Sequence, residues 1–424
     1  MARKMKDSGI EWIGEIPEGW EIKYFVQLFS QVKNKNIGLR EKNLLSLSYG
    51  KIKQKSIETV GGLLPDNFEG YNIIDRNDIV LRLTDLQNDQ HSLRVGLSPE
   101  RGIITSAYCS IRVRGAESPN YLYYYLHTFD IAKGFYGMGS GVRQGLNWDG
   151  LKYIKILLPP QHEQDRISVF LNQKTLEIDS MLSKTISSIE EYKKLKQAVI
   201  TQAVTKGVRG EREMKDSGVD WIGKIPKEWI CEKIKYATSI SRGLFNHRPR
   251  NDERYYNGKY PFIQTGDVAN ATKYIVSYSQ TLNELGKAVS KEFPKGTLTM
   301  TIAANVGDVA ILNFDAYFPD SVVGFIPNKN IRTLYLFYVF SAMKDEFTRT
   351  AIKSTQLNLN IDRVKETFIP VTLNVNEQCE IENYLESKCA EIDGLIAKKE
   401  QLVKELESYK KSLIYEVVTG KREV

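Results

Sequence analysis

The chain contains the same opening segment twice. Residues 5–17 read MKDSGIEWIGEIP and residues 214–226 read MKDSGVDWIGKIP, with ten of thirteen positions identical at a shift of 209. The similarity continues to Trp20 and Trp229 and to the Ile-Lys-Tyr triplets that end at Tyr24 and Tyr236. An internal duplication constrains the fold more than any local pattern does, because each copy must be one structural unit. We therefore expect two halves that open in the same way.

The two halves also close alike. Glu163-Gln164 and Glu377-Gln378 begin segments that align without a gap, at a shift of 214, as far as Val204-Thr205 and Val418-Thr419. Proline upstream, at 159–160 and at 370, blocks helix before each segment, and the glutamate then falls in a first turn, where the helix dipole favours it. Each segment is thus predicted to be one long helix.

Apolar residues recur along both segments with helical, seven-residue spacing, which is typical of a coiled-coil seam. Thr185 and Lys399 interrupt the stripe. A helix of about 40 residues is about 60 Å long, and its apolar face needs a partner. We expect the two copies to pair, in antiparallel fashion so that the intervening domain can loop back. The predicted pairing core is Leu171, Ile178, Leu182, Ile189, Leu195, Val199, Leu385, Ile392, Ile396, Val403, Leu406 and Leu413.

Between these shared segments lie two stretches, about 25–157 and 237–368. They have a similar order of predicted elements but little sequence in common. Short β-type runs occupy residues 43–50, 78–86 and 102–115 in the first stretch, and 260–268, 296–312 and 316–328 in the second. Helical patterns follow at 118–129 and 333–343. The predicted fold class is therefore α/β (α+β): two globular domains with two long antiparallel coiled-coil helices and a pseudo-twofold internal repeat. The expected boundaries are 1–157, 158–208, 209–368 and 369–424, with a charged linker at 206–218.

Composition excludes several classes of protein. Hydrophobic residues make up 42% and charged residues 26% of the 424 positions, which argues against a disordered or collagen-like chain. The four cysteines, Cys109, Cys231, Cys379 and Cys389, form no CxxC pair and have no histidine at zinc-ligand spacing, so we expect reduced thiols and no metal site. The N-terminus lacks the apolar stretch of a signal peptide, and no run is long enough to span a membrane. The expected location is the cytoplasm.

Motifs for catalysis are absent from the sequence. There is no GxxxxGK[ST] loop, no GxSxG and no HExxH. A DNA amino-methyltransferase is expected to carry Asn/Asp-Pro-Pro-aromatic, whereas the single Pro-Pro here is Leu158-Pro159-Pro160-Gln161. The four histidines, His91, His127, His162 and His247, are isolated in sequence, so none is assigned a catalytic role. We expect no catalytic residue and no cofactor bound by this chain.

Basic residues cluster early in both variable stretches. The net charge is +7, and residues 31–55 hold seven basic residues against Glu41 alone. Because neutralised phosphates supply affinity for nucleic acid, we expect DNA contacts from these clusters. The alternative is a solvated face, which recurrence in both stretches disfavours. The candidates are Lys33, Lys35, Arg40, Lys51 and Lys53 in the first stretch, and Arg242, Asn246, Arg248 and Arg250 in the second.

A second polar cluster precedes each long helix. It spans residues 139–147 in the first half and 353–358 in the second. Glutamine suits adenine and arginine suits guanine in the major groove, while small residues let a loop approach closely. The alternative is a turn packed under the helix start, which we favour for Asn147 and Asn358. The candidates from these clusters are Ser140, Arg143, Gln144, Ser354, Thr355 and Gln356, and Thr265 is added from the phrase FIQTGDV.

Four tryptophans, Trp12, Trp20, Trp221 and Trp229, could be mistaken for a platform on which bases stack. They occupy equivalent places in the two halves and lie outside the variable stretches. We therefore expect them to pack each globule against the long helices.

Taken together, these features resemble the DNA specificity (S) subunits of type I restriction-modification enzymes. The resemblance spans the whole chain and rests on Pro-Pro-x-x-Glu-Gln at 159–164, QAVTKG at 202–207, the two WIGxIP openings, FIQTGDV at 262–268 and the duplication. The second copy departs from it with IPVTLNVNEQ in place of a Pro-Pro form and VVTGK in place of AVTKG.

This resemblance implies two target-recognition domains that each read one half of a bipartite, asymmetric site in double-stranded DNA. It also implies two methyltransferase (M) subunits that hold S-adenosylmethionine and modify adenine at N6, and restriction (R) subunits that use ATP and Mg²⁺. This chain would then be a non-catalytic subunit. The competing hypothesis is a coiled-coil scaffold or adaptor without sequence-specific DNA recognition; a single-chain nuclease or methylase ranks last.

Overall fold

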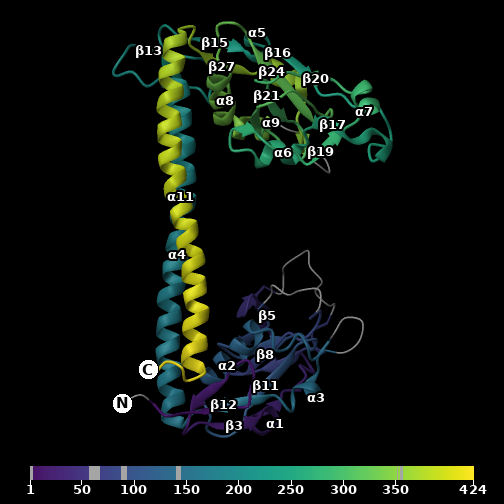
Figure 1. The fold of residues 1–424 in the computed structure, drawn as a ribbon. Helices are drawn as coiled ribbons and strands as arrows, with labels where there is room; N and C mark the ends of the chain where they lie inside the picture. Colours follow the sequence, from purple (N-terminus) through teal and green to yellow (C-terminus); the bar gives the residue numbers. More distant parts are fainter. Residues whose placement is uncertain (1–2, 57–66, 87–92, 140–144, 351, 354–356) are drawn as a thin grey trace. The chain divides into compact units, whose positions relative to one another are not determined.

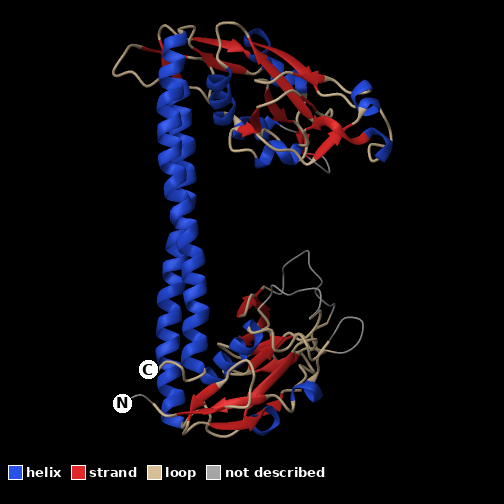
Figure 2. Ribbon diagram, viewed as in Figure 1, coloured by secondary structure: helices blue, strands red, loops and turns tan. Residues whose placement is uncertain are grey.

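The computed structural model describes residues 3–56, 67–86, 93–139, 145–350, 352–353 and 357–424 (Figure 1). The chain separates into two compact units. Unit 1 comprises Met1–Ile186 and Gln401–Val424, and unit 2 comprises Ser187–Glu400. Each unit therefore combines one mixed α/β globule with one stretch of each of two long helices (Figure 2).

Two four-stranded sheets form the body of the unit 1 globule. The first has the order β6 (Lys51–Lys55), β5 (Leu44–Ser48), β10 (Gly102–Ile104) and β7 (Asn72–Ile74). The second has the order β4 (Phe29–Gln31), β11 (Cys109–Val113), β8 (Ile79–Leu81) and β9 (Val95–Leu97). Two short ladders pair β1 (Met5–Asp7) with β2 (Glu15–Pro17), and β3 (Glu21–Tyr24) with β12 (Lys155–Leu158). The run at 102–115, expected as one strand, supplies one strand to each sheet.

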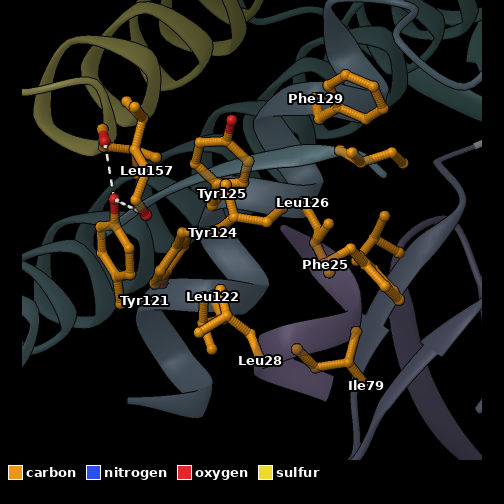
Figure 3. Close-up of a cluster of buried hydrophobic side chains, with 14 of the residues drawn as sticks. Phe25, Leu28, Ile79, Tyr121, Leu122, Tyr124, Tyr125, Leu126, Phe129 and Leu157 are labelled. Carbon is orange, nitrogen blue, oxygen red and sulfur yellow. Dashed lines mark hydrogen bonds between the residues drawn. The ribbon is translucent and has the colours of Figure 1, made fainter. Parts of the chain in front are cut away.

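Three helices accompany these sheets: α1 (Phe25–Leu28), α2 (Pro119–Ile131) and α3 (Trp148–Leu151). The helix predicted at 118–129 is confirmed as α2, which starts where the Ser118 hydroxyl caps the backbone N–H of Tyr121 and Pro119 fills the first turn. Four of its aromatic residues are buried in the core, namely Tyr121, Tyr124, Tyr125 and Phe129 (Figure 3). The hydroxyl of Tyr121 donates to the carbonyls of Leu157 at 3.1 Å and Val418 at 3.2 Å, which joins α2 to a strand end and to a long helix.

Unit 2 has a five-stranded and a four-stranded sheet. The first has the order β16 (Thr238–Arg242), β24 (Val322–Pro327), β21 (Leu298–Thr301), β22 (Val309–Leu312) and β18 (Tyr274–Ile275). The second has the order β19 (Gln280–Leu282), β17 (Tyr256–Phe262), β23 (Ala316–Tyr317) and β20 (Glu292–Phe293). Shorter ladders pair β13 (Met214–Asp216) with β14 (Lys224–Pro226), β15 (Ile230–Lys233) with β27 (Phe368–Val371), and β25 (Ile352–Lys353) with β26 (Leu357–Asn358).

The helices of the unit 2 globule are α5 (Ile234–Ala237), the 3₁₀ turn Glu253–Tyr255, α6 (Thr265–Asn270), α7 (Glu284–Ala288), α8 (Thr333–Ala342), α9 (Lys344–Thr350) and α10 (Ile361–Glu366). The helix predicted at 333–343 is confirmed as α8. The β-type run expected at 260–268 is wrong in its second half, because α6 starts at Thr265. There the side chain of Asp267 accepts the backbone N–H of Gln264 at 2.7 Å, and this local hydrogen bond favours a helical turn.

The two long helices are α4 (Gln161–Lys206) and α11 (Val375–Val418). In unit 1, Leu171 and Ile178 of α4 share a core with Leu413 of α11, and Asp179 binds Lys410 at 2.6 Å. In unit 2, Ile200 shares a core with Ile381 and Leu385, and Lys196 binds Asp393 at 2.6 Å. Within each unit the two stretches therefore run in opposite directions. No helix in the described part of the chain is long and apolar enough to cross a membrane.

Burial along the long helices departs from the predicted pairing core at one position. Leu171, Ile178, Ile189, Leu385, Ile392 and Leu413 are buried, and Leu182, Val199, Ile396, Val403 and Leu406 are half-buried. Leu195 is wrong, because 48% of its surface is exposed. Leu182, Ile189 and Lys196 follow one another at seven-residue intervals along the paired face. Leu195 is one residue before Lys196 and therefore lies about 100° away from that face.

The Glu-Gln pair at each helix start fastens the globule to its helix. In unit 1, Glu163 accepts the indole N–H of Trp20 at 2.9 Å and a guanidinium N–H of Arg3 at 2.6 Å. In unit 2, Glu377 accepts the indole N–H of Trp229 at 3.1 Å and Arg212 at 2.6 Å. Burial would raise the pKa of Glu163, yet the hydrogen bonds from Arg3 and Trp20 lower it overall.

The glutamines that follow bind the N-terminal end of the next helix in each globule. Gln164 accepts the backbone N–H of Ser118 at 2.9 Å, and Gln378 accepts that of Arg332 at 2.8 Å. Trp20 and Trp229 are fully buried. The prediction that the duplicated tryptophans pack the globule is thereby confirmed for these two residues.

Candidate nucleic-acid interface

A row of lysines occupies the edge strand β6 of unit 1. Lys51, Lys53 and Lys55 alternate with Ile52, which is 8% exposed and belongs to the core below the sheet. Because side chains alternate between the faces of a strand, the three ammonium groups share the outer face. Lysines on an edge strand also prevent strand pairing between molecules. Within the described residues the ammonium groups of Lys53 and Lys55 have no ion-pair partner, so their charge faces solvent.

The first lysine of this row is tied to α4, at a carboxylate that also binds α11. Asp179 of α4 binds Lys51 at 2.9 Å through one carboxylate oxygen and Lys410 of α11 at 2.6 Å through the other. Burial would raise the pKa of Asp179, but the hydrogen bonds and charges of the two lysines lower it overall. The start of β6 is thus fixed to the helix pair of unit 1.

Lys33, Lys35 and Arg40 are also exposed, upstream of β5. The Lys35 ammonium donates to the carbonyl of Gly70 at 2.8 Å. Glu41, the acidic residue of this region, binds Arg101 at 3.2 Å, and its pKa is lowered chiefly by a hydrogen bond from the backbone of Asn43. The negative charge of Glu41 is thereby held by a residue outside the cluster, which leaves the neighbouring cations in excess.

The basic segment of unit 2 is more compact and carries its own counter-charge. Arg250 binds the carboxylate of Asp320, Arg248 lies 3.8 Å from the same carboxylate, and Arg242 donates to the Asp320 carbonyl at 2.5 Å. Arg254 binds Asp252 at 2.6 Å. Guanidinium hydrogen bonds from Arg254 hold the pKa of Asp252 well below its usual range. The structure therefore gathers Arg242, Arg248 and Arg250 around one acid, with exposed guanidinium edges.

Two further candidates of unit 2 are placed separately. The side chain of Asn246 is exposed, and its backbone N–H donates to the carbonyl of Val289 at 3.0 Å. Thr265 is half-buried at the start of α6. The same turn is closed by Asp267, which also accepts the backbone N–H of Ser279 at 3.2 Å.

The second polar clusters are described only in part. Ser140, Arg143, Gln144, Ser354, Thr355 and Gln356 all lie outside the described residues, and these predictions stay untested. Asn147 caps α3 by accepting the backbone N–H of Gly150 at 3.1 Å, as the turn interpretation predicts. Asn360 caps α10 in the same way, through the backbone N–H of Asp362 at 2.7 Å. The structural counterpart of Asn147 is therefore Asn360 and not Asn358.

Each of these clusters is joined to a β-hairpin that the sequence reasoning missed. The backbone N–H of Leu146 donates to the carbonyl of Leu83 at 2.9 Å, after β8, and that of Leu359 donates to Ile302 at 2.8 Å, after β21. The residue two positions further has a positive φ in both cases, 55° at Asp85 and 63° at Ala304. Neither of these two residues is glycine, although the unit 2 loop also contains Gly307, whose φ is 84°.

A hollow of about 540 Å³ lies within unit 2 between the globule and its helix stretches. Its charged lining is paired internally: Lys196 with Asp393, and Lys344 with Asp308 at 2.5 Å. No group of three or more His, Cys, Asp or Glu side chains in the described residues is placed to hold a metal ion. The charged surfaces that remain available are the exposed basic clusters.

Comparison with known proteins shows which family this chain is similar to. The model of the family described as "Type I restriction modification DNA specificity domain" matches residues 243–405. A putative type I restriction enzyme MjaX specificity subunit of Methanocaldococcus jannaschii is 25% identical over 428 residues, covering 96% of this chain and 95% of that protein. The MjaVIII specificity subunit of the same organism is 24% identical over 426 residues, covering 96% and 93%.

Solved structures share the fold. A chain studied for complex assembly and conformational transition of the type I R-M system superposes with a TM-score of 0.73 at 16% identity, covering 96% of this chain and 99% of that one. The HsdS subunit from Thermoanaerobacter tengcongensis gives a TM-score of 0.51 at 15% identity, covering 96% and 98%. The fold and the matched domain thus define a DNA-recognition component of restriction-modification systems. Over nearly its whole length the chain is similar to specificity subunits of the type I enzymes, and the resemblance seen in its motifs is confirmed.

Proposed function

We propose that this chain recognises a bipartite, asymmetric site in double-stranded DNA, with a fixed spacer, and directs partner subunits to it. The globule of each unit reads one half-site through the major groove. The chain itself is non-catalytic. Methylation at adenine N6 is carried out by the partner M subunits.

One observation carries this proposal: the two units anchor their globules in the same way but carry different basic surfaces. Both helix starts bind arginine and tryptophan through the same glutamate, as Glu163 and Glu377 do. The basic surfaces differ, with a lysine edge strand in unit 1 and an arginine group around Asp320 in unit 2. Equal scaffolds that carry unequal surfaces suit a protein that reads two different sequences. Their positive charge supplies affinity for phosphates.

The two long helices supply the spacing in this proposal, as an antiparallel coiled coil with a pseudo-twofold relation between the halves. The ion pairs Asp179–Lys410 and Lys196–Asp393 are seventeen residues apart on both helices, which supports one unbroken register. A helix of 46 residues, such as α4, is about 69 Å long at 1.5 Å per residue. That length covers about two turns of DNA, whose equivalent major grooves recur every 34–36 Å or so.

Two M subunits are the partners that the duplicated scaffold suits. Leu195 and Tyr409 occupy equivalent positions of the two helix segments and are 48% and 49% exposed. Exposed apolar residues at equivalent places offer two docks for one type of partner. S-adenosylmethionine belongs to the M subunits in this proposal, and ATP and Mg²⁺ belong to the R subunits of the full complex.

Within the chain, residues 1–157 and 209–368 act as the two target-recognition domains, and 158–208 and 369–424 as the spacer helices. The expected compartment is the cytoplasm, because the substrate is the DNA of the cell or DNA that enters it.

Co-expression with the M subunit of the same system tests the proposal. Genomic DNA should carry N6-methyladenine at one gapped, bipartite motif when this chain is present and not when it is absent. A stable complex with M but no motif would favour the alternative, a non-catalytic coiled-coil scaffold or adaptor without sequence-specific recognition. Failure to bind M would remove the proposed partners.

A further inference from the structure

The hairpin between β21 and β22 places an exposed amide beside one of the two clusters in which we expect base contacts. The strands pair in register from Leu298–Ile311 to Met300–Val309. At their open end the backbone N–H of Thr301 donates to Asp308 at 3.0 Å, and that of Gly307 donates to Thr301 at 2.9 Å. These bonds fix the conformation of the loop 302–307.

Burial divides this loop into an anchored part and a presented part. Ile302 and Val306 are 1% and 5% exposed and lie in the core of unit 2. Ala304 and Asn305 are exposed between them, and Ala304 has a φ of 63°. A non-glycine residue in that region is uncommon and is retained chiefly where the surroundings impose it. Within the described residues the Asn305 amide has no hydrogen-bond partner, so its donor and acceptor are available.

The position of the hairpin links it to DNA recognition. The carbonyl of Ile302 accepts the backbone N–H of Leu359, which follows the second polar cluster directly. Unit 1 repeats the arrangement: Arg82 N–H donates to Arg94 at 2.9 Å, Leu83 accepts Leu146, and Asp85 has the positive φ. The same backbone bond therefore joins each hairpin base to the chain at Leu146 and at Leu359.

The base of the hairpin is held by a charge in each unit, with opposite sign. In unit 1 the guanidinium of Arg94 donates to the carbonyls of Thr84 at 2.7 Å and Asp85 at 3.1 Å, and its backbone N–H donates to Asp130 at 2.7 Å. In unit 2 Asp308 occupies the corresponding place and binds Lys344. Charged residues of opposite sign therefore occupy the base of the hairpin in the two units.

We propose that Asn305 contacts a base of the half-site read by unit 2; this inference rests on the proposed function and names a residue of its reading surface. A side-chain amide pairs in bidentate fashion with N6 and N7 of adenine, and Ala303 and Ala304 have no bulk that would hold the backbone away from the groove. Adenine is therefore the base that Asn305 suits.

The test uses the complete complex of this chain with its M subunit and synthetic duplexes in which each base pair of the site is replaced in turn. The wild-type complex should lose about tenfold in affinity at each base it reads. Asn305→Ala should lose that discrimination at one position of one half-site and keep the rest of the profile. Asn305→Asp should disfavour adenine at that position, because a carboxylate has no N–H for N7.

Asn313→Ala is the matched control, since Asn313 is an exposed asparagine just beyond the other end of β22. Its profile should equal that of the wild type. Unchanged profiles for both Asn305 variants would overturn the inference, as would a uniform loss of affinity for every sequence at a wild-type melting temperature. If Asn305→Ala melts lower than the wild type, Asn305→Ser carries the same test. A wild-type complex without any sequence preference would instead count against the proposed function.

Discussion

Trp229 donates its indole N–H to Glu377 at 3.1 Å, and the other carboxylate oxygen binds Arg212 at 2.6 Å, in the interior of unit 2. Glu377 is 1% exposed. The guanidinium carbon of Arg212 lies 5.3 Å from the centre of the Trp229 ring, so charge, hydrogen bonding and ring contact meet at one helix start.

Glu377→Ala should destabilise unit 2 by about 1–3 kcal/mol, because it removes the buried acceptor of the Trp229 indole and leaves Arg212 only its surface partner Glu228. Chemical unfolding followed by tryptophan fluorescence measures this. Glu380→Ala is the control, since it breaks the exposed pair with Arg209 and should change stability little. Equal effects of the two substitutions would show that burial of the anchor is energetically irrelevant.

Lys53→Ala and Lys55→Ala should each weaken DNA binding to the same extent for all sequences. Each removes one cation from β6 that has no ion-pair partner in the described residues. The slope of log K against log salt should fall by about 1 per lost phosphate contact. Titration of duplex DNA at several salt concentrations gives the slope, with Lys6→Ala on β1 as the control. An unchanged slope in both variants would place β6 away from DNA.

His127 should make unit 1 sensitive to acid. It is 8% exposed, and burial, together with the charges of Lys410 and Lys411, lowers its pKa from 6.5 to about 4. Between these pH values the imidazole binds a proton in the unfolded chain but not in the folded chain. The free energy of unfolding therefore falls as pH decreases through this window. His127→Gln should lose less in melting temperature than the wild type between pH 7.5 and pH 5. His162→Gln, at an exposed position, should follow the wild type; a wild-type response in both variants would contradict the prediction.

Lengthening both long helices by seven residues at facing positions should lengthen the DNA spacer. Seven residues add about 10 Å of helix, which corresponds to about three base pairs at 3.4 Å each. Whole heptads keep the paired face in register, whereas insertion in one helix shifts Lys196 away from Asp393 and should lower stability. Methylation mapping reads the spacer directly. An unchanged spacer in the double insertion would remove the helices from the role of a ruler.

The shared parts of the chain were predictable because identity and periodicity act locally. The duplicated Glu-Gln pairs marked both helix starts within two residues of Gln161 and Val375. Leu195 failed because the seven-residue pattern allowed two neighbouring rows, one through Leu195 and one through Leu182 and Ile189, and only packing against the partner helix decides between them.

The reading surface was predictable in part. The exposure of Lys53 and Arg250 could be predicted from their charge alone. The counter-ion of Arg250 could not, because Asp320 lies in a connection between strands seventy residues later in the chain. The hairpin at Asn305 was missed because residues 296–312 were predicted as one β-type run, although Gly307, with a φ of 84°, marks its turn. The hydrogen bond from Leu359 that places it beside the second polar cluster is a tertiary contact between backbones.

The opposite charges at the base of the two hairpins limit which segments can be exchanged between such chains by recombination. A hairpin carrying Arg94, moved into unit 2, would bring its guanidinium to Lys344, the partner of Asp308. Like charges at close range repel. New specificities assembled by recombination should therefore inherit the hairpin and the helix end that supports it as one block, and a crossover between the two would be selected against even where the reading residues are compatible.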